Sequence, residues 1–353
     1  MNIDSCIIRQ QPEKLQRPLG IGIVGAGNIT NMHLRGYAWA GLPVVAIMDL
    51  DSSKAEARAK EHGIPHVAGS LEELIARPEV EIVDVTFPGN ARLEAVRAIA
   101  EAGKPLLVQK PLADDLETAR EIVRTCREAG VALAVNQNAR FNPQYRTARR
   151  LVEEGVLGEV YHALHHLSSN HDGMPHHAPW LYTPERYQIL QFGVHHLDQI
   201  CTWFGRMPRA VTATNTRKPG QQFKGDMLAT ICLDFGDTAG ATLLELNALH
   251  AKRPYEATFE INGTRGALIG SFDGDLRLYH EDLGKDPKLI RPEGNWFPNA
   301  FGMVMLDFQQ ALRDGREPEV SGEANLPLLA LIEDCYRSIQ ERRTITENER
   351  TPA

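Results

Sequence analysis

Long hydrophobic runs are absent from this 353-residue sequence, and no apolar stretch approaches the roughly 20 residues that a transmembrane helix requires. The first twenty residues carry Asp4, Glu13 and several glutamines where a secretory signal would have an apolar core. Blocks of lysine and arginine interleaved with aromatic residues are also absent, and the formal net charge is −8. We therefore expect a cytoplasmic protein that binds neither membranes nor nucleic acid.

Cysteine is scarce. Its five occurrences lie far apart, without a CxxC pair: Cys6, Cys126, Cys201, Cys232 and Cys335. An odd number of widely spaced cysteines argues against a disulfide framework and suits reduced thiols in a cytosolic protein. We expect most of them to be buried for structural reasons.

Hydrophobic residues make up 42% of the chain, which is enough for two cores of ordinary domain size. From residue 19 to residue 135, short β-branched runs alternate with amphipathic helical stretches. This alternation is typical of an α/β domain with a doubly wound parallel sheet. The predicted strands are residues 19–24, 44–48, 82–86, 105–108 and 131–135.

The second half has a different pattern, in which strand-like runs follow one another closely. They cover residues 159–167, 209–216, 227–235, 240–248, 255–261, 267–271 and 275–279. Short turns between successive strands predict an antiparallel sheet, and helical stretches at 301–312 and 326–340 close the chain. We divide the chain into an irregular N-terminal arm (1–17), a first domain (18–138) and a second domain (139–353).

A glycine-rich turn follows the first predicted strand, where residues 22–30 read GIVGAGNIT. Gly25 allows the tight turn, and Gly27 lets the backbone approach a pyrophosphate. The free N–H groups at the start of the helix, at Asn28 and Ile29, supply hydrogen bonds and a positive dipole for that anion. Thr30 replaces the third glycine of the dinucleotide-binding fingerprint, which predicts slightly looser packing of the helix on the strand.

Asp49 makes this motif more specific. It ends the second predicted strand, 24 residues after Gly25, which is close to the spacing for a carboxylate that accepts both ribose hydroxyls. A carboxylate there repels a 2′-phosphate, and the next residue, Leu50, offers no cation. We predict a Rossmann domain that binds NAD in preference to NADP; an unliganded doubly wound domain is the alternative.

Lys110 follows the strand 105–108 in the sequence VQKP. Ligands of open α/β sheets lie outside the carboxyl ends of the strands, so Lys110 is expected to point into the ligand crevice. A lysine at a strand end is more often a solvated charge, but Pro111 fixes the turn that carries this one.

In order and spacing, these motifs resemble those of the Gfo/Idh/MocA oxidoreductase family, which includes glucose-fructose oxidoreductase and inositol dehydrogenase. The resemblance covers nearly the whole chain. It rests on residues 25–30 with His33, 86–88 (TFP), 110–111 (KP), 138–143 (NARFNP) and 193–198 (GVHHLD). It implies a Rossmann domain followed by a domain with a large, open, mainly antiparallel sheet that binds a sugar or polyol and forms dimers or tetramers.

The resemblance also implies roles for single residues. Lys110 falls at the position of the family's catalytic lysine, and His195 at that of the histidine that exchanges a proton with the substrate hydroxyl. Arg140 falls at a substrate-contacting position. The implied cofactor-binding positions are Gly25, Gly27, Asn28, Ile29, Asp49, Thr86, Pro88, Gln109, Lys110 and Asn138.

A lysine and a histidine suit this chemistry. Hydride transfer from a carbinol carbon to nicotinamide requires that the hydroxyl proton be removed as the hydride leaves. One group must accept that proton while another stabilises the developing alkoxide. From the residues alone, His195 could equally be a hydrogen-bonded core histidine, and His196 and Asp198 could serve only to cap or orient.

Two residues depart from the family pattern. Gln109 stands where the family has a glutamate before the lysine, and Gln191 where it has an aspartate four residues before the histidine. Losing negative neighbours disfavours a protonated lysine, so we hypothesise that the pKa of Lys110 is lowered and that its amine serves as the base. The same departures are also consistent with a loss of catalysis.

These departures favour an aldose substrate, because an anomeric hydroxyl is more acidic than an ordinary secondary alcohol and needs less help from a base. Residues 175–180 (PHHAPW) resemble a subgroup that includes D-apiose dehydrogenase and related aldose dehydrogenases. We assign Gln191, His176, His177 and Trp180 to the substrate site. Trp180 could stack on a sugar ring, or it could anchor a loop as a buried tryptophan.

Two other functions compete with this interpretation. Eight histidines between His162 and His196 could supply a metal site, but none forms a helical HxxxH pair with a carboxylate at ligand spacing, and we predict no metal. A non-catalytic sensor that binds NAD and a sugar is the second alternative. The joint presence of Lys110 and His195 favours an enzyme.

Overall fold

The computed structural model describes residues 3–173, 179–236, 238–249 and 255–350. These residues form two compact units. The first unit contains Gln10–Phe141 and Gly294–Leu326; the second contains the described residues of Met1–Arg9, Asn142–Glu293 and Pro327–Ala353. The sequence pattern did not predict that residues 294–326 return to the first unit.

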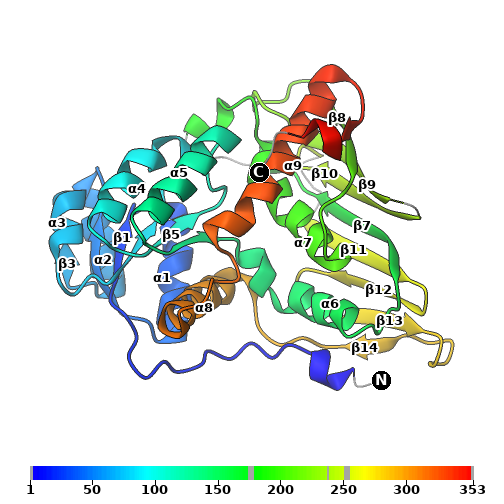
Figure 1. Cartoon of the computed structure of the whole chain (residues 1–353), viewed down its shortest axis with the longest axis horizontal. Coiled ribbons are helices and arrows are strands. Elements are labelled where there is room, and N and C mark those ends of the chain that lie inside the picture. The colour runs from blue at the N-terminus through cyan, green and yellow to red at the C-terminus, as the bar shows by residue number, and fades with distance from the viewer. Residues whose placement is uncertain (1–2, 174–178, 237, 250–254, 351–353) are drawn as a thin grey trace. The chain divides into compact units, whose positions relative to one another are not determined.

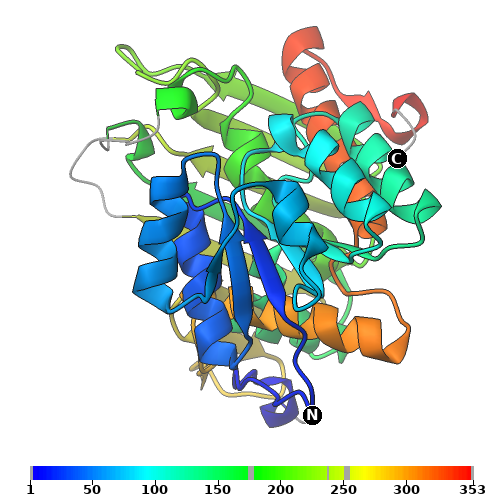
Figure 2. The same ribbon diagram turned by 90° about the vertical axis from the view of Figure 1, so that its left-hand side faces the viewer.

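The first unit is built on a parallel sheet of six strands in the order β3-β2-β1-β4-β5-β6 (Figure 1). The strands are β1 (Ile21–Val24), β2 (Val44–Met48), β3 (His66–Val67), β4 (Ile82–Val85), β5 (Leu106–Gln109) and β6 (Leu133–Asn136). The helices are α1 (Asn28–Ala40), α2 (Ser52–His62), α3 (Leu71–Ala76), α4 (Arg92–Glu101), α5 (Leu116–Glu128) and α8 (Phe301–Asp314). Figure 2 shows helices on both sides of this sheet.

The predicted α/β class of this unit is confirmed, because every predicted strand is present and lies parallel to its neighbours. Strands β1, β4, β5 and β6 are buried along their whole length, which explains their nearly continuous apolar sequences. Only β3 was missed, since its two residues are exposed and show no pattern.

The strand order places the ligand crevice of this sheet. From β1 the chain moves to β2 and β3 on one side, and it then returns to β4 on the other side of β1. The connections after β1 and β4 therefore diverge at the carboxyl edge. In open α/β sheets this point of reversal is where a dinucleotide binds.

Helix α8, from the returning segment, packs closely on α1. A Cβ added to Gly302 of α8 would lie 2.3 Å from the carbonyl oxygen of Gly36 on α1, and a Cβ added to Gly36 would lie 2.8 Å from the Gly302 nitrogen. Because these distances are shorter than van der Waals contact, both helices need glycine at their crossing. The two glycines attach α8 to the Rossmann sheet.

The second unit contains a sheet of nine strands in the order β14-β13-β12-β11-β7-β10-β9-β8-β15. The strands are β7 (Val160–Ser168), β8 (Ala210–Thr216), β9 (Leu228–Gly236), β10 (Ala239–Leu246), β11 (Glu256–Gly263), β12 (Gly266–Ser271), β13 (Leu276–His280), β14 (Lys288–Ile290) and β15 (Ile345–Thr346). The predicted mainly antiparallel sheet is confirmed; β7 and β10 pair in parallel. The short strands β14 and β15 were not predicted.

Helices α6 (Pro143–Glu153) and α7 (Val194–Phe204) pack on this sheet, and α9 (Gly322–Glu341) follows α8 in the chain. In the part of the chain that the structure describes, every helix is too short or too polar to cross a bilayer. All five cysteines are free thiols, and three of them, Cys6, Cys126 and Cys335, are buried.

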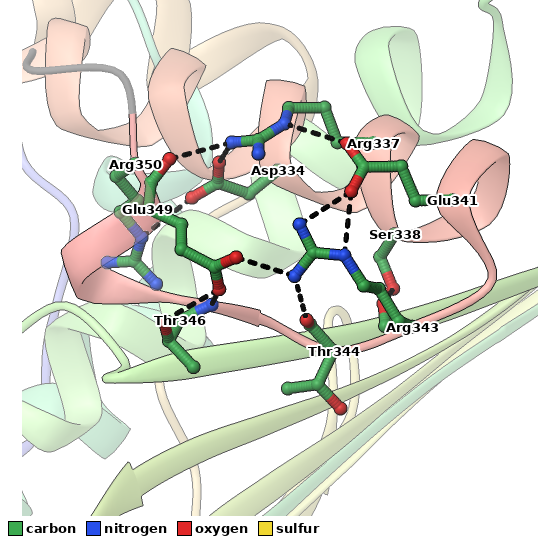
Figure 3. Close-up of polar contacts among 9 residues, drawn as sticks. All are labelled: Asp334, Arg337, Ser338, Glu341, Arg343, Thr344, Thr346, Glu349 and Arg350. Carbon is green, nitrogen blue, oxygen red and sulfur yellow. Dashed lines mark hydrogen bonds and ion pairs between the residues drawn. The ribbon is translucent and has the colours of Figure 1, made fainter.

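Ion pairs join the C-terminal segment around β15 to helix α9, as Figure 3 shows. Strand β15 pairs with β8, and the turn before it carries Arg343, which pairs with Glu341 and Glu349. Arg350 reaches back to the buried carboxylate of Asp334 at 2.7 Å. These contacts cover an edge of β8 that would otherwise present unpaired backbone groups.

Candidate functional site

The loop from β1 to α1 requires glycine at one position and leaves open space at another. Gly25 has a φ of +107°, and a Cβ there would lie 2.7 Å from the Oγ1 of Thr86. Its N–H donates to the carbonyl of Met48 at 2.7 Å, which closes the turn. A Cβ on Gly27, in contrast, would meet no atom within 4 Å. The backbone at Gly27 is therefore accessible to a large anionic group.

The start of α1 offers donors to such a group. Its N-cap is Gly27, no side chain caps the first turn, and that turn contains no acidic residue. Asn28 is exposed and Ile29 is half-buried. The N–H groups of the first turn and the positive end of the helix dipole therefore suit a pyrophosphate.

Thr30 connects the helix to the glycine-rich loop through its side chain. Its side chain is fully buried, and its hydroxyl contacts the carbonyl of Gly25 at 3.1 Å and the hydroxyl of Thr86 at 2.8 Å. Thr86 in turn donates to the carbonyls of Val24 and Gly25. The glycine-rich loop is thus hydrogen-bonded to the end of β4, and the Thr86 hydroxyl faces that loop.

Asp49 is fixed beside the same loop. One carboxylate oxygen accepts the Ala26 N–H at 2.6 Å, and the other accepts the Asp51 N–H at 2.9 Å. Each oxygen keeps a lone pair for a further donor, such as a ribose hydroxyl. Leu50, the next residue, is 98% exposed, so an apolar side chain lies beside this carboxylate in place of a cation.

Lys110 directly follows β5 and is half-buried. Its N–H donates to Gln109 Oε1 at 2.7 Å, and the Lys110–Pro111 peptide bond is cis. Burial, followed by the nearby charge of Arg92, lowers the pKa of Lys110 to about 8. The direction is the one predicted from the sequence. The pKa is lowered by burial and by a nearby cation, whereas the prediction attributed the change to missing carboxylates.

Gln109 takes part in a buried polar network beneath Lys110. Because Gln109 Oε1 accepts the Lys110 N–H, its amide nitrogen faces His33 Nε2, at 3.2 Å. His33 therefore accepts at Nε2 and donates from Nδ1 to Asp84, at 2.8 Å. Tyr37 donates to the same Asp84 oxygen at 2.6 Å. The Gln109 amide therefore donates to a histidine whose other ring nitrogen donates to the buried carboxylate of Asp84.

The residues after β6 are held by the returning segment. Asn138, which is buried, accepts a hydrogen bond from Trp296 Nε1 at 2.8 Å. The guanidinium of Arg140, which is half-buried, donates to the carbonyl of Glu319 at 3.0 Å. Pro88, the remaining predicted position of this unit, is exposed after the end of β4.

In the second unit, a π-helical turn leads into α7 and carries Gln191. The turn spans Ile189–Gly193, and His195 lies in the first turn of α7, where it is buried. Asp226 holds the start of this segment, because its two carboxylate oxygens accept the N–H groups of Tyr187 and Ile189 at 2.7 and 3.0 Å. π-Helical turns of this kind occur frequently at functional sites.

Glu245 of β10 holds the same segment from the sheet. Its fully buried carboxylate pairs with His196 through one oxygen and accepts the Gln188 amide through the other, at 2.5 Å. Gln188 also accepts from Asn247 at 2.8 Å. One carboxylate therefore bonds residues on both sides of the turn that carries Gln191.

The histidines that raised the metal alternative occupy different environments. His165 stacks on His196 with ring centroids 4.0 Å apart, and its Nε2 lies 2.9 Å from the Tyr145 hydroxyl. Burial, then the neighbouring His196 and His166, hold the pKa of His165 well below its ordinary value. Among the described residues, three metal-binding side chains come close together only in the group His280, Glu281 and Asp282 at the end of β13, where His280 is buried and the two carboxylates are exposed.

Trp180 lies in a short 3-10 turn, Pro179–Tyr182. His176 and His177 lie outside the described residues.

The structure also contains buried charges that the sequence did not predict: Asp84, Arg92 and Glu245. Asp84 and Glu245 each interrupt an apolar strand, which is a usable signal, because a carboxylate is rarely fully buried without a partner. Arg92 shows no such pattern.

Comparison with known proteins identifies the family. Residues 19–137 match the oxidoreductase family with an NAD-binding Rossmann fold, and residues 145–269 match the GFO/IDH/MocA C-terminal domain. The D-apiose dehydrogenase of Paraburkholderia graminis is 28% identical over 92% of this chain and 88% of its own length. The 1,5-anhydro-D-fructose reductase of Ensifer adhaerens is 31% identical over 88% of this chain and 92% of its own length.

Among solved structures, an oxidoreductase from Agrobacterium radiobacter in complex with NAD+, L-tartaric acid and magnesium superposes with a TM-score of 0.85. It is 24% identical, and the match covers 94% of this chain and 98% of that one. The chain belongs to the Gfo/Idh/MocA oxidoreductase family, and its first unit is an NAD-binding Rossmann domain.

Proposed function

We propose that this protein is an NAD-dependent dehydrogenase that oxidises a carbinol group of a sugar or polyol. The proposal rests on the position and the lowered pKa of Lys110. This lysine lies half-buried at the carboxyl end of β5 in an NAD-binding Rossmann domain, and its pKa is lowered to about 8. A lysine with such a pKa is uncharged often enough near neutral pH to accept a proton.

The cofactor would be held by the loop after β1 and by Asp49. The open space at Gly27 and the uncapped N–H groups at Asn28 and Ile29 support pyrophosphate binding. Asp49 would bind the ribose hydroxyls and repel a 2′-phosphate, which supports NAD over NADP. Bound NAD supplies a hydride acceptor. The further cofactor positions carried over from the family are Thr86, Pro88, Gln109, Lys110 and Asn138.

The side chains of Lys110 and His195 would handle the hydroxyl proton. The amine of Lys110 takes the proton as the hydride leaves, and His195 hydrogen-bonds the oxygen on which negative charge develops. His195 lies in the first turn of α7, which the buried pair of His196 and Glu245 holds against the sheet. Arg140, Gln191, His176, His177 and Trp180 would contact the substrate.

An aldose oxidised at its anomeric carbon to a lactone fits the site best. Gln109 and Gln191 are neutral, so the site has fewer carboxylates to raise the pKa of a basic group. An anomeric hydroxyl is more acidic than an ordinary secondary alcohol, so a weaker base is enough to deprotonate it. The relative named D-apiose dehydrogenase supports the same substrate class. We also propose that the protein forms a homodimer or homotetramer through the outer face of its nine-stranded sheet.

The experiment is an assay of NADH formation across a panel of aldoses and inositols, with NADP in place of NAD as a parallel series. We expect turnover with at least one aldose and faster reaction with NAD. Tight NAD binding without turnover of any sugar would contradict the proposal and favour a sensor that binds both ligands without reaction.

A further inference from the structure

Arg92 is a buried cation at the edge of the Rossmann sheet where Lys110 lies. It is the first residue of α4 and is 1% exposed. One guanidinium nitrogen donates to the carbonyls of Pro111 and Leu112, at 3.0 Å to the latter, and another donates to the carbonyl of Phe87 at 2.6 Å. Phe87 follows β4, whereas Pro111 and Leu112 follow β5.

These three hydrogen bonds connect the ends of two neighbouring strands. Strands β4 and β5 pair through their main chains up to Val85 and Val108, so the residues beyond them have left the ladder. Arg92 joins them again outside the sheet, on the carboxyl side of Lys110. A guanidinium suits this role, because its rigid fork of donors can serve several carbonyls at once.

The charged groups at this corner are Arg92, Lys110, Asp84 of β4 and Asp114. Burial lowers the pKa of Arg92 to about 10, against the opposing effect of Asp114 and Asp84. Arg92 therefore remains protonated at neutral pH. A permanent positive charge disfavours a second one nearby, and Arg92 is the second cause, after burial, of the lowered pKa of Lys110.

Building on the proposed function, we infer that Arg92 is a positioning residue for the base: it fixes the turn that carries Lys110 and places a constant positive charge beside it. Two properties are separable here. The hydrogen bonds set the geometry of the turn, and the charge sets the pH range in which the Lys110 amine can accept a proton.

The test compares variants by the pH profiles of their kcat and kcat/KM, with the aldose that reacts best and saturating NAD. Arg92→Lys keeps the charge but offers donors from a single nitrogen, whereas the guanidinium donates to Phe87 and to Pro111 and Leu112 from two different nitrogens. We therefore expect a lower kcat and an acidic limb at the same pH as in the parent. Arg92→Gln removes the charge, so we expect the acidic limb to move to higher pH by about one unit. Arg97→Gln is the matched control, since Arg97 is exposed on the same helix and pairs with Glu94 and Glu121.

If the acidic limb of Arg92→Gln stays at the pH of the parent, or if Arg97→Gln shifts the limb equally, the charge of Arg92 does not set the pKa of Lys110. Parent-like kcat in Arg92→Lys would overturn the positioning part, and that variant remains informative if Arg92→Gln does not fold. Lys110→Met separates the two proposals. If its residual activity keeps the acidic limb of the parent, the limb does not belong to Lys110, and it is the proposed function that fails.

Discussion

The carboxylate of Glu245 and the imidazole of His196 form a fully buried pair between β10 and α7. The same carboxylate accepts the amide of Gln188, on the other side of the π-helical turn. Gln191 lies within the segment bounded by these two contacts, and His195 directly precedes His196. The pair therefore holds the segment that carries Gln191 and His195, to which we assign roles in substrate binding and catalysis.

Replacing Glu245 should damage turnover more than cofactor binding. Glu245→Leu leaves His196 and Gln188 without their partner and should cost about 3–5 kcal/mol of unfolding free energy. Glu245→Gln can still bond both neighbours, so its stability and kcat should lie between those of the parent and Glu245→Leu. Denaturant unfolding, kcat and the dissociation constant for NAD measure these effects. Thr242→Val, on the opposite face of β10, is the control.

If Glu245→Leu unfolds at the same denaturant concentration as the parent, the buried pair does not hold α7. If Glu245→Gln is no more active than Glu245→Leu, the contacts to Gln188 and His196 do not set the rate.

Asp49 should determine both the affinity for NAD and the choice against NADP. Loss of two hydrogen bonds from ribose hydroxyls to a charged acceptor should raise the KM for NAD about 10- to 100-fold in Asp49→Ser. The same variant should discriminate less against NADP, because the repulsion of the 2′-phosphate is removed. Asp51→Asn is the control, since Asp51 caps α2 two residues away. An unchanged NAD-to-NADP ratio in Asp49→Ser would refute this assignment.

Restoring the family's aspartate at position 191 should shift the pH dependence of the reaction. If Gln191 and Lys110 contact the same substrate, as proposed, a carboxylate at position 191 would stabilise the protonated amine and raise the pKa of Lys110 from its value of about 8. The uncharged base then forms only at higher pH, and the acidic limb of kcat/KM in Gln191→Asp should move upward. An acidic limb that stays in place would show that Gln191 does not influence the base.

The crossing of α1 and α8 should tolerate no side chain larger than hydrogen. Gly302→Val places methyl groups against the backbone of Gly36 and should lower the unfolding free energy by about 1–3 kcal/mol or more. Gly284 is exposed, with no atom near its missing Cβ, so Gly284→Val is the matched control. Equal thermal midpoints for the two variants would contradict the close packing.

Much of the fold follows from local patterns. The glycine turn, the apolar strands of the first unit and the close succession of strands in the second each reflect interactions within a few residues. These patterns gave the correct class for both sheets. The two-residue strands β3 and β15 depend on tertiary pairing alone, so they leave no periodic signal.

The chemistry of the site was less accessible. The sequence gives the direction of the pKa change at Lys110, but its causes are burial and Arg92, which lies 18 positions away. Likewise, Gln109 is a departure from the family in sequence terms. In the structure its amide matches the acceptor nitrogen of His33. Such pairings depend on which side chains come into contact in the folded protein, and the spacing of residues in the sequence does not predict these contacts.

The central claim is that the amine of Lys110 accepts the substrate proton during hydride transfer. The most direct measurement is single-turnover NADH formation by the parent and by Lys110→Met, with NAD binding measured separately. Because Lys110 is also assigned to the cofactor site, the two proteins are compared at equal NAD occupancy. We predict that Lys110→Met then forms NADH about 100- to 10,000-fold more slowly than the parent. A single-turnover rate equal to that of the parent, at equal NAD occupancy, would contradict the claim.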